Sequence, residues 1–187
     1  MAVVTVAEQP RVTYADLQSW PDDGRRYELY DGEVWVMPAP MLMHQDAAQA
    51  VYRLLHAYSE AHGGKAVIAP IDIVFDDLNV LQPDVVFFTA GRRHFLRRDR
   101  VIRIPPDVAV EVLSPGTARN DRGRKMQTFA RFGVPEYWIA DPVEKTIEVW
   151  RLVDGAYTRH THAGTGEGVR SVVLDGLEFD VDPVFAE

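Results

Sequence analysis

Residues 105–115 read PPDVAVEVLSP, an apolar run that carries one glutamate, Glu111, inside it. Apolar residues on both sides of the pleat are typical of a central strand that is covered on both faces of its sheet. An ionised carboxylate in such a strand is costly unless it is paired, bound to a metal or protonated. Glu111 is therefore the first candidate site residue, and it requires partners from elsewhere in the chain.

Length and composition indicate a single globular domain. The chain has 187 residues, and a chain of this size buries roughly 70% of its unfolded surface. It contains no cysteine, which excludes disulfides and thiolate metal sites. Because neither a signal peptide nor an apolar run of roughly 20 residues is visible, we expect a cytoplasmic protein with no membrane partner.

The apolar patterns predict a hairpin, a helix, three strands, a second helix and a further strand, followed by antiparallel strands. An Asp-Gly pair at 31–32 between two alternating segments predicts the hairpin. Apolar residues at helical spacing predict helices over 44–62 and 119–132. A strand is expected over 66–75.

This order predicts a mixed α/β (α+β) fold in which a sheet is flanked by helices. We expect one domain over 1–187. An N-terminal arm and a short helix would occupy 1–24, the core 25–142, and a β extension 143–187.

Two acids accompany the core strands. Asp84 begins an apolar strand directly after Pro83, and Glu111 lies inside the next core strand. Side chains alternate along a strand, so Asp84 and Glu111 share a face of the sheet if the strands pair in suitable register. Two carboxylates on one face repel each other unless a cation lies between them. Oxygen ligands of this kind favour Mg²⁺ or Mn²⁺, so the sequence predicts a metal site here.

Three further side chains are candidates for the same site. Lys125 lies roughly 7 Å along the second helix from Asn120, and its long stem can reach the strand end near Glu111. An ammonium there would orient a water or a phosphate. Glu28 shares a hairpin face with Tyr30, and His44 opens the first helix. A structural buried Glu–Lys or Glu–Arg pair, a solvent-facing Glu28 and a surface or capping His44 are the alternatives.

Basic residues are concentrated in two segments of an acidic chain. The net charge of −8 argues against a wholly nucleic-acid-binding surface. Residues 91–103 nevertheless read GRRHFLRRDRVIR, and residues 119–131 add further basic side chains. Such a local basic surface can bind phosphate. The alternative is that these arginines are solvated or paired with acids. The candidate nucleic-acid contacts are Arg92, Arg93, Arg97, Arg98, Arg119 and Arg122.

Several short motifs occur together in a specific order. They are YELYDGE at 27–33, HQ at 44–45, QPDVV at 82–86, EVLSP at 111–115, Asp121 with Lys125, and GVPEYWI at 133–139 before Asp141-Pro142. The Pro-Asp and Glu-Val-Leu segments resemble the PD-(D/E)XK nuclease superfamily. The whole chain resembles the Uma-type family of restriction endonucleases, which implies a restriction-endonuclease-like core with a central mixed sheet between helices.

The resemblance implies a metal-dependent endonuclease that hydrolyses phosphodiester bonds, with DNA as the expected substrate. By match of motif, Asp84 and Glu111 would hold Mg²⁺ or Mn²⁺, and the backbone carbonyl of Val112 would complete the set. Glu28 would correspond to the catalytic acid contributed early in the chain. Nucleases of this type commonly act as dimers, so the resemblance also implies a homo-oligomer.

The lysine of the superfamily requires a separate comparison. It usually stands two residues after the glutamate, where this chain has Leu113. The Uma-type pattern places the lysine on the following helix, which matches Lys125. The resemblance therefore implies that Lys125 holds the attacking water or the charge of the transition state.

Two other functions are compatible with the sequence. The net charge and Leu113 are consistent with a catalytically inactive nucleic-acid-binding or interaction module on the same scaffold. Glu28 and Glu111 could alternatively serve as the paired acids of a hydrolase that acts on sugars. Lys125 and the arginine clusters fit phosphate better than sugar.

Overall fold

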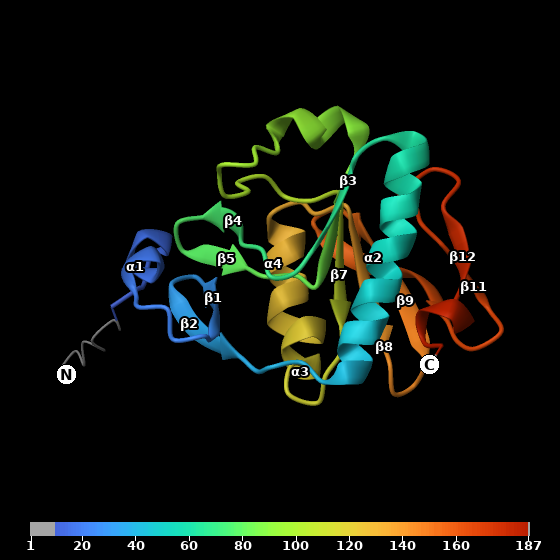
Figure 1. Ribbon diagram of the computed structural model, residues 1–187, viewed down its shortest axis with the longest axis horizontal. Coiled ribbons are helices and arrows are strands. Elements are labelled where there is room, and N and C mark those ends of the chain that lie inside the picture. Colours follow the sequence, from blue (N-terminus) through green and yellow to red (C-terminus); the bar gives the residue numbers. More distant parts are fainter. Residues whose placement is uncertain (1–9, 187) are drawn as a thin grey trace, which may run out of the picture.

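The computed structural model describes residues 10–186, and a six-stranded mixed sheet forms its centre (Figure 1). The sheet has the spatial order β10-β9-β8-β7-β6-β3, with β3 Lys65–Ile68, β6 Val85–Phe88, β7 Val108–Val112, β8 Glu136–Asp141, β9 Thr146–Val153 and β10 Ala156–Ala163. Strands β7 and β8 run parallel, and the other neighbouring pairs are antiparallel. The predicted mixed α/β fold is confirmed.

A smaller, four-stranded antiparallel sheet carries the N-terminal hairpin. Its order is β2-β1-β5-β4, with β1 Arg26–Tyr30, β2 Glu33–Met37, β4 Ile73–Asp76 and β5 Asn79–Leu81. Asp31 and Gly32 have φ angles of 51° and 81°, as a two-residue hairpin turn with positive φ at both positions requires. The predicted hairpin is confirmed, and its strand β1 pairs with β5 through Leu29 and Val80.

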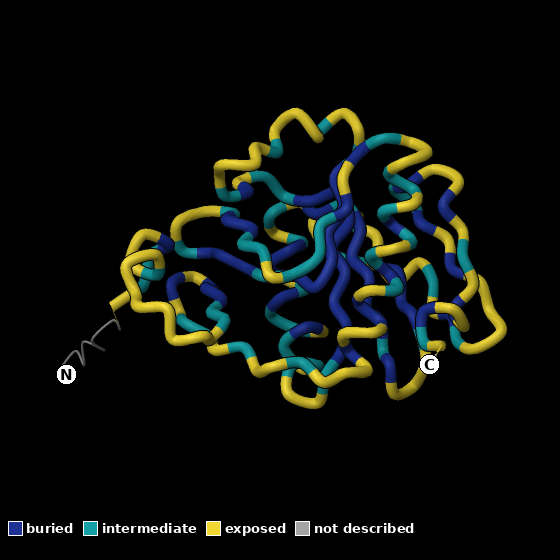
Figure 2. Tube along the Cα trace, viewed as in Figure 1, coloured by how far each residue is buried: buried dark blue, intermediate teal, exposed yellow. Residues whose placement is uncertain are grey.

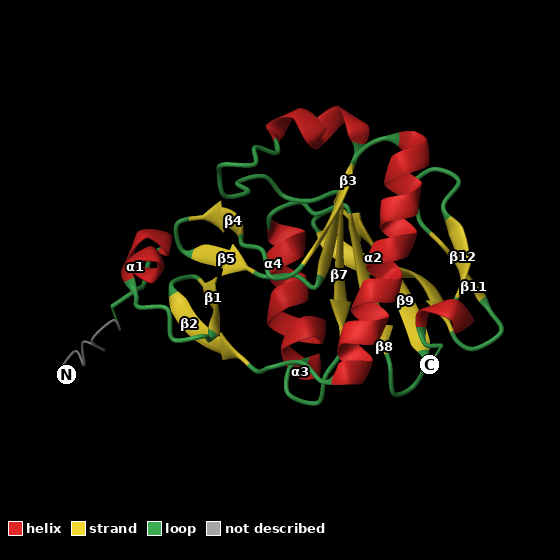
Figure 3. Cartoon of the chain, in the orientation of Figure 1, coloured by secondary structure: helices red, strands yellow, loops and turns green. Residues whose placement is uncertain are grey.

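Helices cover the two faces of the large sheet. On one face, Ala47, Val51 and Leu55 of α2 (Leu42–His62) pack against Val110 and other buried residues of the sheet. On the opposite face, Phe129 of α4 (Met126–Arg131) belongs to the second core cluster. Figure 3 shows β7 between these helices, and Figure 2 shows that the central strands are the most continuously buried part of the chain.

The second predicted helix is not a uniform α-helix. It consists of α3 (Ala118–Asn120), a π-helical turn η2 (Asp121–Lys125), and α4. Gly123 lies in this turn, and glycine supports a regular α-helix poorly. A π turn widens the helix locally, and here it leaves Asp121 and Lys125 both buried.

The strand expected over 66–75 is wrong as one element. Strand β3 ends at Ile68, and the chain enters a different sheet at β4. Pro70 lies in the interruption, and proline has no N–H with which to continue a strand ladder.

The remaining elements extend the two ends of the domain. A capping box between Thr13 and Asp16 begins α1 (Tyr14–Ser19). A 3₁₀ turn, η1 (Ala90–Phe95), follows β6. Strands β9 and β10 continue the large sheet beyond β8, while β11 (Gly168–Arg170) pairs with β12 (Glu178–Asp180) before η3 (Asp182–Val184).

Two sequence expectations concern the termini and the membrane. Most of the expected N-terminal arm, residues 1–9, lies outside the described residues. Within residues 10–186, no helix is both long and apolar enough to cross a membrane.

The carboxylate of Glu136 joins the C-terminal segment to the large sheet. Glu136 is fully buried at the start of β8. Its Oε1 accepts hydrogen bonds from the Trp138 indole and the Ser171 hydroxyl, and its Oε2 accepts from the backbone N–H groups of Val172 and Val173. One buried side chain therefore satisfies donors that are distant in the sequence.

We predict that Glu136→Ala lowers the free energy of unfolding by about 3 kcal/mol, because several buried donors lose their acceptor. Urea unfolding followed by tryptophan fluorescence measures the change. Glu60 is exposed on α2, so Glu60→Ala is the matched control and should shift the free energy by less than about 0.5 kcal/mol. Equal effects of the two variants would contradict the role assigned to Glu136.

Candidate active site

Asp84 and Glu111 lie close together at one end of the large sheet. Val85 is opposite Val110 in the β6–β7 ladder. Asp84 directly precedes Val85, and Glu111 directly follows Val110, so both lie at the same end of the two strands. The backbone N–H of Val112 donates to Asp84 Oδ2 at 2.8 Å, which fixes this carboxylate at the carboxyl end of β7.

Lys125 joins three separate parts of the chain at this point. Its Nζ lies 2.8 Å from Glu111 Oε1 and 2.9 Å from Glu28 Oε1. The three residues are 1%, 3% and 0% exposed, so water does not screen these ion pairs. The structure thus brings the helix turn, strand β7 and the hairpin together around one ammonium.

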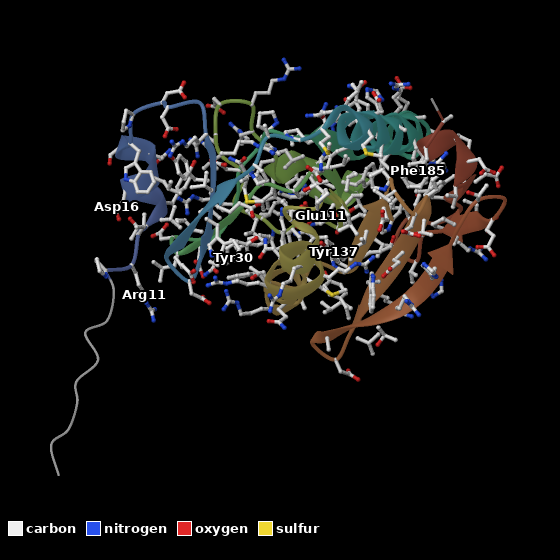
Figure 4. All side chains as sticks on the ribbon, turned by 90° about the horizontal axis from the view of Figure 1, so that it is seen from below. Arg11, Asp16, Tyr30, Glu111, Tyr137 and Phe185 are labelled. Carbon is white, nitrogen blue, oxygen red and sulfur yellow. The ribbon has the colours of Figure 1, made fainter. Side chains whose placement is uncertain are left out.

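Both carboxylate oxygens of Glu28 have partners. Its Oε1 also accepts from the backbone N–H of Gln82 at 2.8 Å, and its Oε2 accepts from the Tyr30 hydroxyl at 2.7 Å. Asn120 donates to the same hydroxyl at 2.9 Å. Figure 4 shows Tyr30 and Glu111 within the mass of side chains between the hairpin and the large sheet. A solvent-facing Glu28 is therefore excluded.

His44 faces the site from the first turn of α2. It is 7% exposed, and its Nε2 lies 3.1 Å from Asp84 Oδ2. Met41, not His44, is the N-cap residue of α2. The structure therefore excludes a surface or capping role for His44 and places it against Asp84.

Asp121 is a sixth ionisable side chain of the site. It is named with Lys125 in a family motif but is not among the site residues predicted from the sequence. It is 1% exposed, and the Thr117 hydroxyl lies beside its carboxyl group. The spacing of Asp121 and Lys125 is the sequence signal that could have identified it. That signal is weak, because residues four apart neighbour each other on any helix.

All of these groups except Glu28 line a small cavity. It is lined by Asp84, Glu111, Asp121, Lys125, His44 and Arg26, among others. Its volume of about 20 Å³ is enough for one water molecule or ion. A second cavity of about 240 Å³ shares Arg26, Pro40 and Asp84 with the first, so the site continues into a larger open space.

Burial and neighbouring charges shift the protonation of these groups in different directions. Burial raises the pKa of Glu111 well above its ordinary value, and Asp84, Asp121 and Glu28 add to this rise against the opposing charge of Lys125. Burial alone would lower the pKa of Lys125, but Glu111 and Glu28 outweigh it and raise the pKa. Lys125 is therefore a permanent ammonium.

Asp84 and Asp121 differ although both are buried. Burial would raise the pKa of Asp84, but the hydrogen bond and charge of His44, together with Lys125 and the Val112 N–H, lower it below the ordinary value. Burial raises the pKa of Asp121 to about 6, and Lys125 only partly offsets this. The site thus combines one carboxylate held ionised with one that retains its proton to a higher pH.

The donor set fits a divalent cation in its chemistry. Glu28 and Glu111 contact the ammonium of Lys125, and its charge also acts on Asp84 and Asp121. An excess of buried negative charge favours a cation. Among residues 10–186, no three His, Asp or Glu side chains are already arranged around one metal position. Asp84, Glu111 and Asp121 are the carboxyl groups that line the cavity and could hold one, whereas Glu28 is saturated by Lys125, Tyr30 and Gln82.

The arginines predicted to contact nucleic acid lie in two places. Arg92 pairs with Asp107 at 2.9 Å. Asp107 directly precedes β7, whereas Glu111 lies near the end of β7, so roughly 13 Å of strand separates Asp107 from Glu111. The segment of Arg92, Arg93, Arg97 and Arg98 is therefore at the opposite end of the sheet from the cavity (Figure 1, top of the view).

Two predicted arginines lie on the helical segment beside the site. Arg119 is exposed on α3, next to the cavity residues Thr117 and Asp121. Arg122 pairs with Glu148 at 2.9 Å. Arg26 also lines the cavity and donates to the Pro38 carbonyl at 3.0 Å, although no sequence signal identified it.

The comparisons with known proteins agree with this architecture. A family model described as "Uma2: Putative restriction endonuclease" matches residues 14–182. A crystal structure of "a putative nuclease belonging to DUF820 from Anabaena variabilis ATCC 29413" is similar, with a TM-score of 0.74 and 18% sequence identity over 93% of this chain and 97% of that chain. At this identity the likeness shows the fold, and the predicted resemblance is confirmed. No curated protein matches the sequence.

We predict that Lys125→Met lowers the free energy of unfolding at pH 7 by about 3–5 kcal/mol, because two buried carboxylates lose their counter-charge. A carboxyl group whose pKa is raised in the folded state stabilises the fold most when it is protonated. The loss should therefore shrink as the pH falls toward roughly 4.3, the ordinary pKa of glutamate, and grow as it rises.

Urea unfolding of wild type and variant across this pH range measures the effect. Lys65 is exposed on β3, so Lys65→Met is the matched control, with an expected change within about 0.5 kcal/mol. A loss for Lys125→Met that is small or does not depend on pH would contradict the buried ion-pair cluster.

Proposed function

The chain belongs to the Uma2 family of putative restriction endonucleases, and we propose that it is a metal-dependent endonuclease that hydrolyses phosphodiester bonds in DNA. One observation carries the proposal. Lys125 contacts Glu28 and Glu111 inside the protein, with Asp84 at the end of the neighbouring strand. This arrangement provides oxygen ligands for a cation and a fixed ammonium for a phosphate.

Asp84, Glu111 and the backbone carbonyl of Val112 would hold Mg²⁺ or Mn²⁺. The bound metal would polarise a phosphoryl oxygen and lower the pKa of a coordinated water. His44 and the Val112 N–H keep Asp84 ionised and fixed, which prepares it for this role.

Lys125 acts as a donor in this mechanism. Because its pKa is raised, it does not accept the proton of the attacking water. Its ammonium instead orients that water or stabilises the negative charge that develops on the phosphoryl group. Glu28, which was expected to be catalytic, accepts hydrogen bonds from Tyr30 and Gln82 in addition to the ion pair, so we assign it the positioning of Lys125.

The basic side chains contribute phosphate contacts, which position a duplex without specifying its sequence. Arg119 and Arg26 are near the cavity, whereas Arg93, Arg97 and Arg98 would contact a more distant part of the DNA. Arg92 forms an ion pair with Asp107, and Arg122 forms one with Glu148, so these two arginines attract phosphate less strongly. We further propose a cytoplasmic homo-oligomer, since cutting two strands requires two sites.

A second candidate is an inactive nucleic-acid-binding module. It is favoured by the ion pairs of Lys125, which already satisfy Glu28 and Glu111 in a closed cluster. It predicts DNA binding that weakens with salt and with the loss of Arg97 and Arg98, without turnover.

We predict that the wild-type protein nicks supercoiled plasmid DNA when Mg²⁺ or Mn²⁺ is added and that EDTA abolishes the reaction. Glu111→Gln and Asp84→Asn should slow nicking by a factor on the order of 10²–10³, because each removes a charged oxygen from the site. Gel electrophoresis of the plasmid over time measures the rates.

Glu60→Gln is the control for this experiment, since Glu60 is exposed on α2, and it should cleave at the wild-type rate. Equal cleavage by wild type and both site variants would show that Asp84 and Glu111 are not needed for nicking, which would contradict the proposed active site. DNA binding with no metal-dependent cleavage by the wild type would favour the inactive module.

A further inference from the structure

The larger cavity beside the proposed metal site has no role in the reaction described above. Its volume is about 240 Å³, more than ten times the roughly 10–15 Å³ that one water molecule needs. It is also smaller than the roughly 300–1,000 Å³ of sites that take drug-sized ligands. A group of intermediate size, such as a single planar ring system, therefore fits this space.

Most of the wall of this cavity is apolar. Pro40 comes from the segment before α2, Ala48 from α2 itself, and Ile68 and Pro70 from the end of β3 and the residues after it. An apolar wall favours an uncharged ring over a phosphate, because a phosphate would lose its hydration there. Within residues 10–186, no aromatic side chain lines the cavity.

Polar groups are few, and they suit the edge of a nucleobase. Arg26, Gln45 and Asp84 are the polar side chains that line the cavity. The Pro38 carbonyl accepts one hydrogen bond from Arg26 at 3.0 Å, and a guanidinium has five N–H donors in all. The amide of Gln45, the second residue of the His-Gln motif, is exposed and carries both donors and an acceptor. Base edges present the same two kinds of group.

The cavity is continuous with the proposed active site. Asp84, Arg26 and Pro40 line both cavities. Because Asp84 is a proposed ligand of the cation, a phosphate bound to that cation would lie next to the larger cavity, and its own nucleoside would be the group nearest to it. A base in a duplex is paired and stacked, so it can enter such a pocket only after it leaves the stack.

Exposed apolar side chains accompany the cavity at the start of α2. Met41 is 59% exposed and Leu42 is 77% exposed. They stand in the chain between Pro40 and Gln45, which both line the cavity. When one nucleotide leaves the stack, the face of its neighbour is uncovered, and Leu and Met side chains pack against such faces in other DNA complexes. Met41 and Leu42 thus fit DNA whose stacking is interrupted here.

We propose that this cavity binds the base of an unstacked nucleotide adjoining the cut linkage, with Gln45 and Arg26 at the edge of the base. The inference rests on the proposed nuclease function and names its substrate class, a nucleic acid with an unpaired nucleotide at the cut. With Mg²⁺, the wild type should cut a duplex with one unpaired nucleotide on the order of tenfold faster than the fully paired duplex of the same sequence, because the cost of unpairing is already removed. Equal rates on the two duplexes would contradict the proposal.

A fluorescent base tests the pocket directly. The probe is a DNA duplex whose single unpaired nucleotide is 2-aminopurine, an adenine analogue that is quenched when it stacks on other bases. Ca²⁺, which also takes oxygen ligands, replaces Mg²⁺ during the measurement. At saturating wild-type protein the fluorescence should rise about threefold or more, because the base leaves the stack for a pocket without an aromatic ring among its described residues. A paired 2-aminopurine elsewhere in the same duplex should not brighten.

Gln45→Trp is the variant that fills the cavity, and Gln49→Trp is its matched control. Both glutamines are exposed on α2, but only Gln45 lines the cavity. Anisotropy of a fluorescein label on the duplex establishes that each variant is saturated. Gln45→Trp should then lose the rise in 2-aminopurine fluorescence, whereas Gln49→Trp should keep it. A rise that persists in Gln45→Trp overturns the pocket.

The two readouts separate the pocket from the nuclease function. A wild-type protein that binds the duplex and cuts it with Mg²⁺ but gives no rise in fluorescence overturns the pocket and leaves the nuclease function intact. A rise that depends on Gln45, without cleavage of any DNA, supports the pocket and overturns the nuclease function. Failure to bind the duplex at all overturns both.

Discussion

The ammonium of Lys125, held between Glu28 and Glu111, is the interaction on which the site depends. It connects the hairpin, the central strand and the crossover helix at distances of 2.8 and 2.9 Å. A lysine this deeply buried is tolerated only with excellent ion pairing, because the loss of hydration costs several kcal/mol per ion. Hydrogen bonds from the Tyr30 hydroxyl and the Gln82 backbone N–H to Glu28 hold this carboxylate in place beside Lys125.

The same cluster carries more negative than positive charge. Asp84 and Asp121 add two further carboxyl groups within the field of Lys125, and burial raises the pKa of Glu111 and Asp121. A protein selected only for stability would replace such groups by apolar side chains of similar volume. Their presence around the end of β7 fits a site that exchanges protons or cations during its function.

The sequence predicted those parts of the site that depend on local pattern. Glu111 was evident because a charge inside an apolar strand is anomalous, and Asp84 was expected beside it because it begins the neighbouring apolar strand. Asp121 was named with Lys125 in a motif but was not predicted as a site residue, because its burial depends on a π turn, which no periodicity reveals. The position of residues 92–98 depends on the antiparallel direction of β6 and β7, which short apolar runs do not specify. Pro70 gave a signal for the interruption of the strand expected over 66–75, but the change of sheet is a tertiary property.

The central claim is that Asp84 and Glu111 hold a divalent cation beside Lys125. The most direct measurement is a crystal structure of the protein soaked in Mn²⁺, with the metal located by anomalous scattering. The account predicts one peak within about 2–2.5 Å of oxygens from both Asp84 and Glu111, the usual range for hard cations. A peak elsewhere, or no peak while Lys125 keeps both ion pairs, would contradict it.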